Sequence, residues 1–293
     1  PFKIPTGSMQ PTLYGITHEN FRGRDDVKFP SGFAAFVDSW LRGVSYFHVV
    51  CEEDGELRDV EQPKTVVPLL VKKQRFQVGN HVYTVWFPPD QLFGGNAHRS
   101  GLMPGQPFRK GEDIIKLRVT SGDHLFVDRL SYNFRRPERG EIIVFETKGI
   151  EGLPQDQFYI KRLVALGGEQ VAIGNDRHLR INGRRLDAST PRFENVYHLT
   201  GPPRESEFSG HVNELVANQN QRGGLARLFT DERASFQVRP EHYMVMGDNT
   251  MNSLDSRAWG DFAQTSVIGK SAFVYWPFLN QGERPGRFGW SHR

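Results

Sequence analysis

The pattern of apolar and polar positions predicts one helix and several strands in the first part of the chain. Apolar side chains recur at helical spacing between residues 32 and 49, which predicts an amphipathic helix. The runs 65–71 and 81–87 are typical of strands, and the turn-rich stretch 88–112 predicts a loop. The apolar stripe of the helix, which we expect to face the core, consists of Phe33, Phe36, Val37, Trp40, Leu41 and Val44.

From residue 113 onwards, short apolar runs separated by turn residues predict a β-meander. Asn182 and Gly183 lie between strand-like flanks, which indicates a hairpin. Residues 187–240 are polar and irregular, and we find no internal repeat. The chain is therefore predicted to be mostly β, with the helix near 32–49. The runs expected to form the meander and two later strands are 113–119, 123–130, 140–146, 157–166, 169–173, 242–249 and 269–278.

Composition narrows the class of protein. The 293 residues are 37% hydrophobic and 24% charged, which indicates a folded chain long enough for two domains. A net charge of +3 gives no argument for nucleic-acid binding. Cys51 is the only cysteine, which excludes an internal disulfide. No metal or organic cofactor is implied. The sequence contains no run of 18 apolar residues, the length that could span a bilayer.

Ser8, in the segment Ile-Pro-Thr-Gly-Ser-Met-Gln-Pro-Thr-Leu at 4–13, is either a turn residue or a nucleophile. A nucleophilic serine needs a base within hydrogen-bonding reach. None of the ten histidines lies in a recognisable catalytic signature. Asp123 and His124 are adjacent on a predicted strand, so they point to opposite faces and do not form a dyad.

Lys161 is the better candidate for the base. In a strand over 157–166 it shares a face with apolar neighbours, and loss of solvation there lowers the pKa of an amine. A shift of roughly three pH units, worth about 4 kcal/mol, would make it a base near neutral pH. Arg162 stays charged and cannot take this role. Spacing alone favours the alternative, an edge lysine that extends to water.

A third informative segment, 247–262, follows the apolar strand near 242–246. It is dense in polar side chains bracketed by glycines, which is typical of a loop and also of a site. Ser253, Asp255, Ser256 and Arg257 could hold one another and a charged partner through hydrogen bonds.

Four segments together resemble the conserved boxes of bacterial type I signal peptidases, in the same order. They are Ile-Pro-Thr-Gly-Ser-Met-Gln-Pro-Thr-Leu at 4–13, Gly-Asp-His-Leu-Phe with the residues up to 145, Tyr-Ile-Lys-Arg with the residues up to 169, and Gly-Asp-Asn-Thr-Met-Asn-Ser-Leu-Asp-Ser-Arg-Ala-Trp-Gly at 247–260. The resemblance implies a β-sheet serine protease that removes signal peptides from exported preproteins. It also implies that Ser8 is the nucleophile and Lys161 the general base of an acyl-enzyme mechanism.

The resemblance implies roles for further residues. Ser253 would orient the lysine amine, Asp255 and Arg257 would form a supporting salt bridge, and the Ser8 backbone N–H and Thr6 hydroxyl would form the oxyanion hole. The substrate would bind as an added β-strand, with small residues such as Ala-x-Ala before the cleaved bond. The residues matching the walls of its shallow apolar pockets are Phe2, Ile4, Pro5, Met9, Leu13, Tyr159 and Ile160.

Two features depart from the family pattern. A stretch of 108 residues, 14–121, separates Leu13 from Gly122, where relatives turn within a few residues. It would be a lid, a docking module or a decoration, and it shows no paired catalytic residues. Thr250 and Met251 stand where the family often carries Arg-Asp.

The expected organisation follows from these segments. We expect a discontinuous catalytic β core, a large α/β insertion of unknown role, a second β-rich subdomain and a flexible tail. The ranges are 1–13, 115–174 and 241–279 for the core, 14–114 for the insertion, 175–240 for the subdomain and 280–293 for the tail.

The resemblance also implies a location and partners. The expected location is the bacterial cytoplasmic (inner) membrane, with the catalytic domain on the outer, periplasmic face. Because the chain opens on Pro1 without Met, we expect an anchoring segment before it. The expected partners are preprotein signal peptides and the membrane lipid surface, without nucleic acid; the oligomeric state is open. The alternatives are an inactive peptide-binding or scaffold protein of the same fold, and a self-cleaving Ser/Lys regulator, which would carry a DNA-binding domain.

Overall fold

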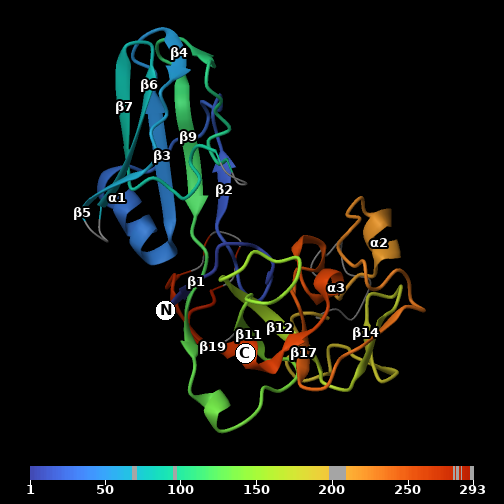
Figure 1. Cartoon of the computed structure of the whole chain (residues 1–293). Helices are drawn as coiled ribbons and strands as arrows, with labels where there is room; N and C mark the ends of the chain where they lie inside the picture. The colour runs from blue at the N-terminus through green and yellow to red at the C-terminus, as the bar shows by residue number, and fades with distance from the viewer. Residues whose placement is uncertain are drawn as a thin grey trace. The chain divides into compact units, whose positions relative to one another are not determined.

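The computed structural model describes residues 1–67, 71–94, 98–197, 209–279, 281, 284 and 286–290. The chain forms two compact units (Figure 1). Unit 1 comprises residues 1–16, 122–279 and 285–293, and unit 2 comprises 17–121 and 280–284. Among the described residues, no helix is both long and apolar enough to cross a membrane.

Unit 1 is built on a seven-stranded antiparallel sheet. On its central strand, β11, Ile142 and Val144 join one apolar cluster while Ile143 and Phe145 join another, so both faces of the sheet are covered. The sheet therefore has a buried middle in which a charged side chain would lose its water. In spatial order its strands are β1 (Phe2–Lys3), β10 (His124–Asp128), β19 (Val267–Trp276), β11 (Ile142–Glu146), β12 (Phe158–Leu166), β17 (His242–Met246) and β18 (Phe262–Ala263).

A smaller sheet of unit 1 contains the predicted hairpin. Asn182 and Gly183 both have positive φ, 50° and 80°, as a tight two-residue turn between antiparallel strands requires. Its core continues into that of the large sheet, because Val171 and Ile173 share a cluster with Met244 and Met246. Its strands, in spatial order, are β15 (Arg184–Arg185), β14 (Leu179–Ile181), β13 (Gln170–Ile173) and β16 (Ser235–Gln237).

Two short helices and three helical turns complete the described part of unit 1. Asn213 caps α2 (Glu214–Gln219) by accepting a hydrogen bond from the N–H of Val216. Asp255 caps α3 (Ser256–Trp259) in the same way. The remaining helical turns are η2 (Ser131–Asn133), η3 (Thr250–Asn252) and η4 (Gln264–Ser266).

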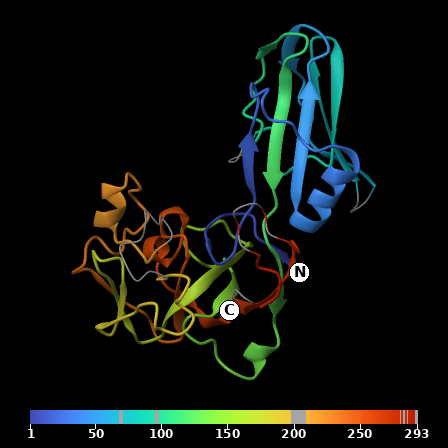
Figure 2. The same cartoon turned by 180° about the vertical axis from the view of Figure 1, so that it is seen from behind.

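Unit 2 consists of two antiparallel sheets, visible from both sides in Figures 1 and 2. One has the order β2 (Thr17–Asn20), β9 (Asp113–Thr120), β3 (Val44–Val50). The other has the order β5 (Lys64–Val67), β6 (Val71–Val78), β4 (Gly55–Arg58), β8 (Pro107–Phe108), with β7 (His81–Trp86) also paired to β6. Cys51 is a free, buried thiol in this unit.

The predicted helix is present but shorter than expected. α1 (Gly32–Val37) runs on into a π-helical turn, η1 (Asp38–Arg42), and Gly43 ends it at φ 66°. The run after Gly43 is rich in β-branched and aromatic residues and forms β3 instead. The prediction that its aromatic stripe faces the core is wrong, because Phe33, Phe36 and Trp40 are 80%, 62% and 60% exposed.

The predicted meander is wrong in its first strands, because β19 lies between β10 and β11 and the run before β10 belongs to another sheet. The run 113–119 forms β9, which pairs with β2 and β3 in unit 2 and not with the large sheet of unit 1. The core range 115–174 therefore begins too early, and unit 2 extends beyond 114 to residue 121. Strand character is a local property, whereas the choice of sheet depends on partners far away in the chain.

The expectation of a flexible tail at 280–293 is wrong for residues 286–290. Arg287 is buried and forms an ion pair with Asp123 at 2.8 Å, and Gly289 pairs with Val274. The ion pair with the buried Asp123 carboxylate holds Arg287 in place. Residues 291–293 lie outside the described residues, as do 68–70 of the predicted strand 65–71, 95–97 of the predicted loop and 198–208 of the predicted subdomain.

Candidate active site

The segment around Ser8 is held to unit 1 from two sides. Its apolar residues Ile4, Met9 and Leu13 are buried, with 1%, 0% and 0% exposure, in the cluster on one face of the large sheet. On the other side, the backbone N–H of Asn249 donates to the carbonyl oxygen of Ser8 at 3.0 Å. The Asn249 side-chain amide donates to the carbonyl of Gly7, also at 3.0 Å. Ser8 is therefore positioned by anchored backbone and not by a free turn.

Lys161 meets Ser8 directly. It lies on β12, between β11 and β17 in the large sheet, and its side chain is 5% exposed. Its Nζ donates to Ser8 Oγ at 2.8 Å and to the Ile160 carbonyl at 3.2 Å. The alternative of an edge lysine extending to water is thus wrong, because β12 is an internal strand.

Burial changes the acidity of this amine. Loss of solvation lowers the pKa of Lys161 from 10.5 to about 8, although the carboxylates of Asp255 and Asp248 oppose the shift. A sizeable fraction of the amine is then neutral near neutral pH. A neutral amine at 2.8 Å from a serine hydroxyl is able to accept its proton.

Asp255 and Arg257 form the salt bridge that the sequence predicts. Arg257 Nε lies 2.8 Å from Asp255 Oδ1, and both side chains are fully buried. Burial by itself raises the pKa of Asp255, but Arg257, together with the N–H of Gly247 and the nearby Ser253 hydroxyl, brings the pKa below its ordinary value. Arg257 also donates to the hydroxyl and the carbonyl of Thr250, each at 2.8 Å. The residue that departs from the family pattern therefore serves as a second acceptor for Arg257.

Ser253 lies beside this network and helps to lower the pKa of Asp255. Its Oγ is buried and has no hydrogen-bond partner among the described residues. A Cβ atom on Gly247 would come within 2.2 Å of this Oγ and 2.4 Å of the Ser8 carbonyl oxygen, so glycine is needed here. The hydrogen bonds found for Lys161 go to Ser8 and Ile160, and the orienting role of Ser253 stays a prediction.

Thr6 lies next to the nucleophile. It is exposed, and its Oγ1 donates to Ser8 Oγ at 3.4 Å. The hydroxyl is thus close enough to approach a group bound at Ser8, while its part in an oxyanion hole stays a prediction.

The predicted substrate-contact residues divide into three groups. Ile4, Met9, Leu13 and Ile160 share one buried cluster, with Phe2 packed against it. Tyr159 packs against the cluster on the opposite face, and its ring centre lies 5.5 Å from Lys161 Nζ. Pro5 is exposed. The structure brings these side chains around the Ser8 segment, but the most buried of them have little surface to offer a ligand.

A buried pair that the sequence did not reveal joins the same region. Arg162 Nε lies 2.7 Å from Asp248 Oδ1, and the Thr12 hydroxyl donates to Asp248 Oδ2 at 2.5 Å. The pair connects β12, the segment after β17 and the end of the Ser8 segment. An arginine inside an apolar strand needs a buried partner, and this is the only indication the sequence offered.

Comparison with known proteins places this site in a family. The family model described as "Signal peptidase, peptidase S26" matches residues 114–276, which is more than half of the chain. The chain belongs to the S26 signal peptidase family. The family predicted from the four segments is thereby confirmed, as is the mostly β fold class. Lys161 and the segment 247–257 lie inside the matched region of the S26 model, while Ser8 lies before it.

Individual S26 relatives are moderately similar. A signal peptidase I of Leptolyngbya laminosa is 31% identical over 166 residues, covering 55% of this chain and 64% of the relative. One of Bacillus caldolyticus is 31% identical over 162 residues, covering 55% and 73%. A probable signal peptidase I-2 of Synechocystis is 28% identical over 161 residues, and the match spans 58% of that relative's length.

A solved structure also shows limited similarity. The crystal structure of a signal peptidase I from Enterococcus faecalis V583 is 26% identical, covers 46% of this chain and 97% of that chain, and aligns with a TM-score of 0.31.

Proposed function

We propose that this chain carries the catalytic activity of a signal peptidase I, an endopeptidase that removes N-terminal signal peptides from exported preproteins. The observation that supports it best is the 2.8 Å contact between the buried Lys161 amine and the Ser8 hydroxyl in a member of the S26 family. The same activity would account for a lysine whose pKa is lowered to about 8, because a serine nucleophile needs a neutral base.

The proposed reaction has two stages. The neutral amine of Lys161 accepts the Ser8 proton while Oγ attacks the carbonyl carbon of the scissile peptide bond. The bond to the leaving amine breaks, the lysine ammonium returns the proton to it, and an acyl-enzyme ester remains on Ser8. Water then gives a proton to Lys161 as it attacks the ester, and Ser8 recovers that proton as it leaves.

Surrounding residues would support these steps. The Ser8 backbone N–H and the Thr6 hydroxyl, 3.4 Å from Ser8 Oγ, would stabilise the oxyanion. Ser253 would orient the lysine amine, since its hydroxyl is buried beside the same network, close enough to help lower the pKa of Asp255. Asp255 and Arg257 would fix the backbone around it, because Asp255 also accepts from the N–H of Gly247 at 2.9 Å.

The proposed substrate is an extended segment with small residues at positions one and three before the cleaved bond. It would pair as an added strand next to the Ser8 segment. Apolar walls that admit only a methyl group would exclude larger side chains. We further propose that the chain works at the bacterial cytoplasmic membrane, on its periplasmic face, in contact with the lipid surface.

The test is cleavage of a preprotein with an Ala-x-Ala site, followed by gel mobility and mass spectrometry of the product. Ser8→Ala and Lys161→Ala should each lower kcat/KM by about a thousandfold or more. Ser189→Ala and Lys148→Ala, at exposed positions, are matched controls and should cleave like the wild type. If both site variants cleave at the control rate, the dyad is wrong; if the wild type binds the preprotein without cleaving it, the chain is a peptide-binding protein.

A further inference from the structure

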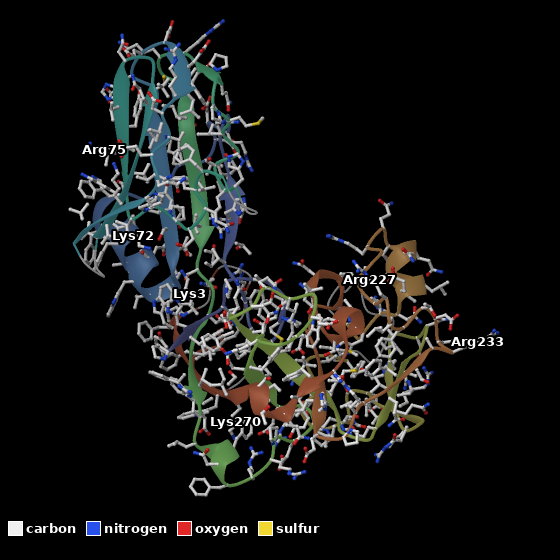
Figure 3. The ribbon with its side chains drawn as sticks, viewed as in Figure 1. Lys3, Lys72, Arg75, Arg227, Arg233 and Lys270 are labelled. Atoms are coloured by element: carbon white, nitrogen blue, oxygen red, sulfur yellow. The ribbon has the colours of Figure 1, made fainter. Side chains whose placement is uncertain are left out.

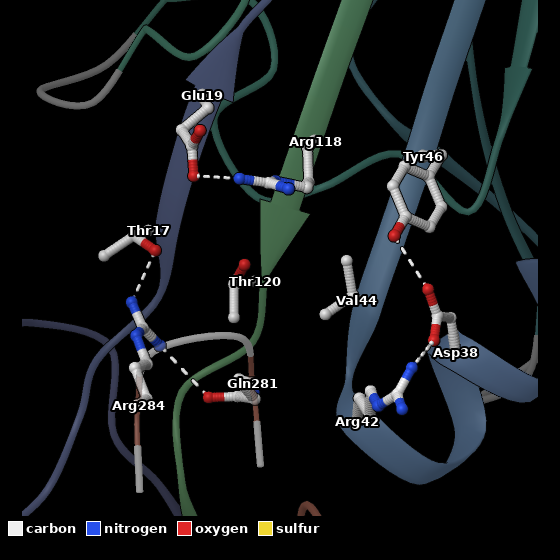
Figure 4. Close-up of a pocket in the computed structure, with 10 residues that line it drawn as sticks. All are labelled: Thr17, Glu19, Asp38, Arg42, Val44, Tyr46, Arg118, Thr120, Gln281 and Arg284. Atoms are coloured by element: carbon white, nitrogen blue, oxygen red, sulfur yellow. Dashed lines mark hydrogen bonds and ion pairs between the residues drawn. The ribbon is translucent and has the colours of Figure 1, made fainter. Parts of the chain in front are cut away.

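A polar hollow lies on one face of the three-stranded sheet in unit 2 (Figure 4). The strand register aligns Thr17 and Val44 with Thr120, and two residues further along it aligns Glu19 and Tyr46 with Arg118. Residues two apart on a strand share a face, so these rows form one floor. Residues of η1, together with Gln281 and Arg284, complete a cavity of about 720 Å³, which is large enough for a small organic ligand.

Three arginines from three separate segments line this hollow. Arg42 comes from η1, Arg118 from β9 and Arg284 from the C-terminal segment, whereas Asp38 and Glu19 are the two carboxylates. The lining therefore carries one more positive than negative charge. Figure 4 shows Arg118 reaching towards Glu19, Arg284 between Thr17 and Gln281, and Arg42 beside Asp38, beyond Val44.

The carboxylates leave donor groups available. Arg42 Nη1 lies 2.7 Å from Asp38 Oδ1, and Arg118 Nη2 lies 2.6 Å from Glu19 Oε1, so each pair is formed through one nitrogen. A guanidinium has five N–H donors, so a further anion can bind without breaking these pairs.

The negative charges in the hollow are already partly compensated. The second oxygen of Asp38 accepts from the Tyr46 hydroxyl at 2.7 Å, so both of its oxygens are engaged. Glu19 is 57% exposed, and water and salt screen its repulsion of an incoming anion.

We propose that this hollow binds a phosphate group. A tetrahedral oxyanion presents oxygens in several directions, which suits guanidinium groups that line one hollow from three segments. Its source is a free phosphate compound or a phospholipid headgroup. The second source is supported by the exposed Phe33, Phe36 and Trp40 on the same helical segment as Arg42, because aromatic side chains are enriched at lipid interfaces.

The first experiment titrates the whole chain with pyrophosphate by calorimetry at constant ionic strength. Arg118→Gln and Arg42→Gln should each raise the dissociation constant for pyrophosphate by about tenfold, because each removes a charge-assisted hydrogen bond. Glu19→Gln should lower this dissociation constant, because it removes a negative charge that repels the anion. Arg75→Gln is the matched control, since Arg75 is exposed on β6 in the other sheet of unit 2 (Figure 3), and it should bind like the wild type.

The second experiment measures flotation of the same proteins with vesicles of phosphatidylcholine, with and without phosphatidylglycerol. Vesicle binding that depends on Arg118 and Arg42 assigns the site to a headgroup; pyrophosphate binding alone with that dependence assigns it to a free phosphate. Equal behaviour of Arg118→Gln, Arg42→Gln and Arg75→Gln towards both probes, at unchanged melting temperatures, overturns the proposal. Ser8→Ala should bind both probes normally, which separates this site from the proposed peptidase activity.

Discussion

Lys161 carries a charge in water at neutral pH, yet its amine lies inside a sheet at 5% exposure. Lowering its pKa from 10.5 to about 8 corresponds to about 3 kcal/mol of folding free energy. Because the folded pKa is the lower one, the unfolded state binds more protons between these values, and stability rises with pH between them. Below pH 8 the folded state is destabilised by this full amount, so the destabilisation is present at neutral pH.

The pH dependence of cleavage follows from the same residue. We expect kcat/KM to fall about tenfold per pH unit below about 8 and to level off above it, because only the neutral amine of Lys161 accepts the Ser8 proton. The measurement is initial-rate kinetics between pH 5 and 10 on a peptide without ionisable groups near the cleaved bond. A flat profile down to pH 5 contradicts Lys161 as the base.

At the scale of single residues, the sequence predicted that Lys161 meets Ser8 and that Asp255 pairs with Arg257, because each of these residues stands in a short, characteristic segment. It did not predict that Arg162 pairs with Asp248, since 86 positions separate them and both have ordinary neighbours. It also missed Asn249, whose contacts to Gly7 and Ser8 are visible only when the chain has folded.

Neighbouring elements of the large sheet are connected across its end by charged and polar groups. Arg162 on β12 reaches Asp248 after β17, and Thr12 of the Ser8 segment bonds to the same carboxylate. Both charged side chains are almost completely buried, at 2% and 0% exposure. Such a pair fixes how the elements fit together, because a shift of either one leaves a buried charge without a partner.

Removing one member should therefore destabilise unit 1. Asp248→Asn should lower the free energy of unfolding by about 3–5 kcal/mol, since it leaves the Arg162 guanidinium buried and uncompensated. The measurement is urea denaturation followed by tryptophan fluorescence. Asp26→Asn, which breaks the exposed pair with Arg24, is the control and should change stability by less than about 1 kcal/mol. Similar losses in the two variants would show that the buried pair is not a structural requirement.

Sequence patterns were reliable for elements whose cause is local. The hairpin at Asn182–Gly183 follows from its turn residues, and the later apolar runs became strands of unit 1. Sequence patterns failed where pairing with a strand far away in the chain determines the structure. The stretch after Gly43 has helical spacing but pairs with β9, and β9 joins β2 and β3 although β10 of the large sheet follows it directly in the chain.

At the scale of the whole molecule, the long insertion 17–121 leaves and re-enters unit 1 at neighbouring residues. The N–H of Asp123 donates to the Tyr14 carbonyl at 2.8 Å, and the N–H of Tyr14 donates to the Asp123 carboxylate at 2.7 Å. The two ends of the insertion are thus held together by unit 1 itself. Because the cost of closing a loop grows slowly with its length, such an insertion leaves the core undisturbed.

Replacing residues 17–121 with a short Gly/Ser linker tests this arrangement. We expect unit 1 to fold cooperatively and to retain at least about a tenth of the wild-type cleavage rate, because Ser8, Lys161 and Arg257 all lie in unit 1. Thermal unfolding by circular dichroism and the preprotein assay check the two parts. Loss of the cooperative transition would make unit 2 part of the folding core, and loss of only some substrates would make it a selector.

The distance between Ser8 and Lys161 along the chain has a consequence for synthesis. Ser8 leaves the ribosome 153 residues before Lys161, which contacts it, and all of residues 17–121 of unit 2 emerge between them. The strands of unit 2 within 17–121 can pair while Lys161 and most of the large sheet of unit 1 have not yet been synthesised. Until the strands between Ile142 and Trp276 have been made, Ser8 of a nascent chain therefore lacks the sheet that brings Lys161 to it. The order of translation itself delays the moment at which the site can form.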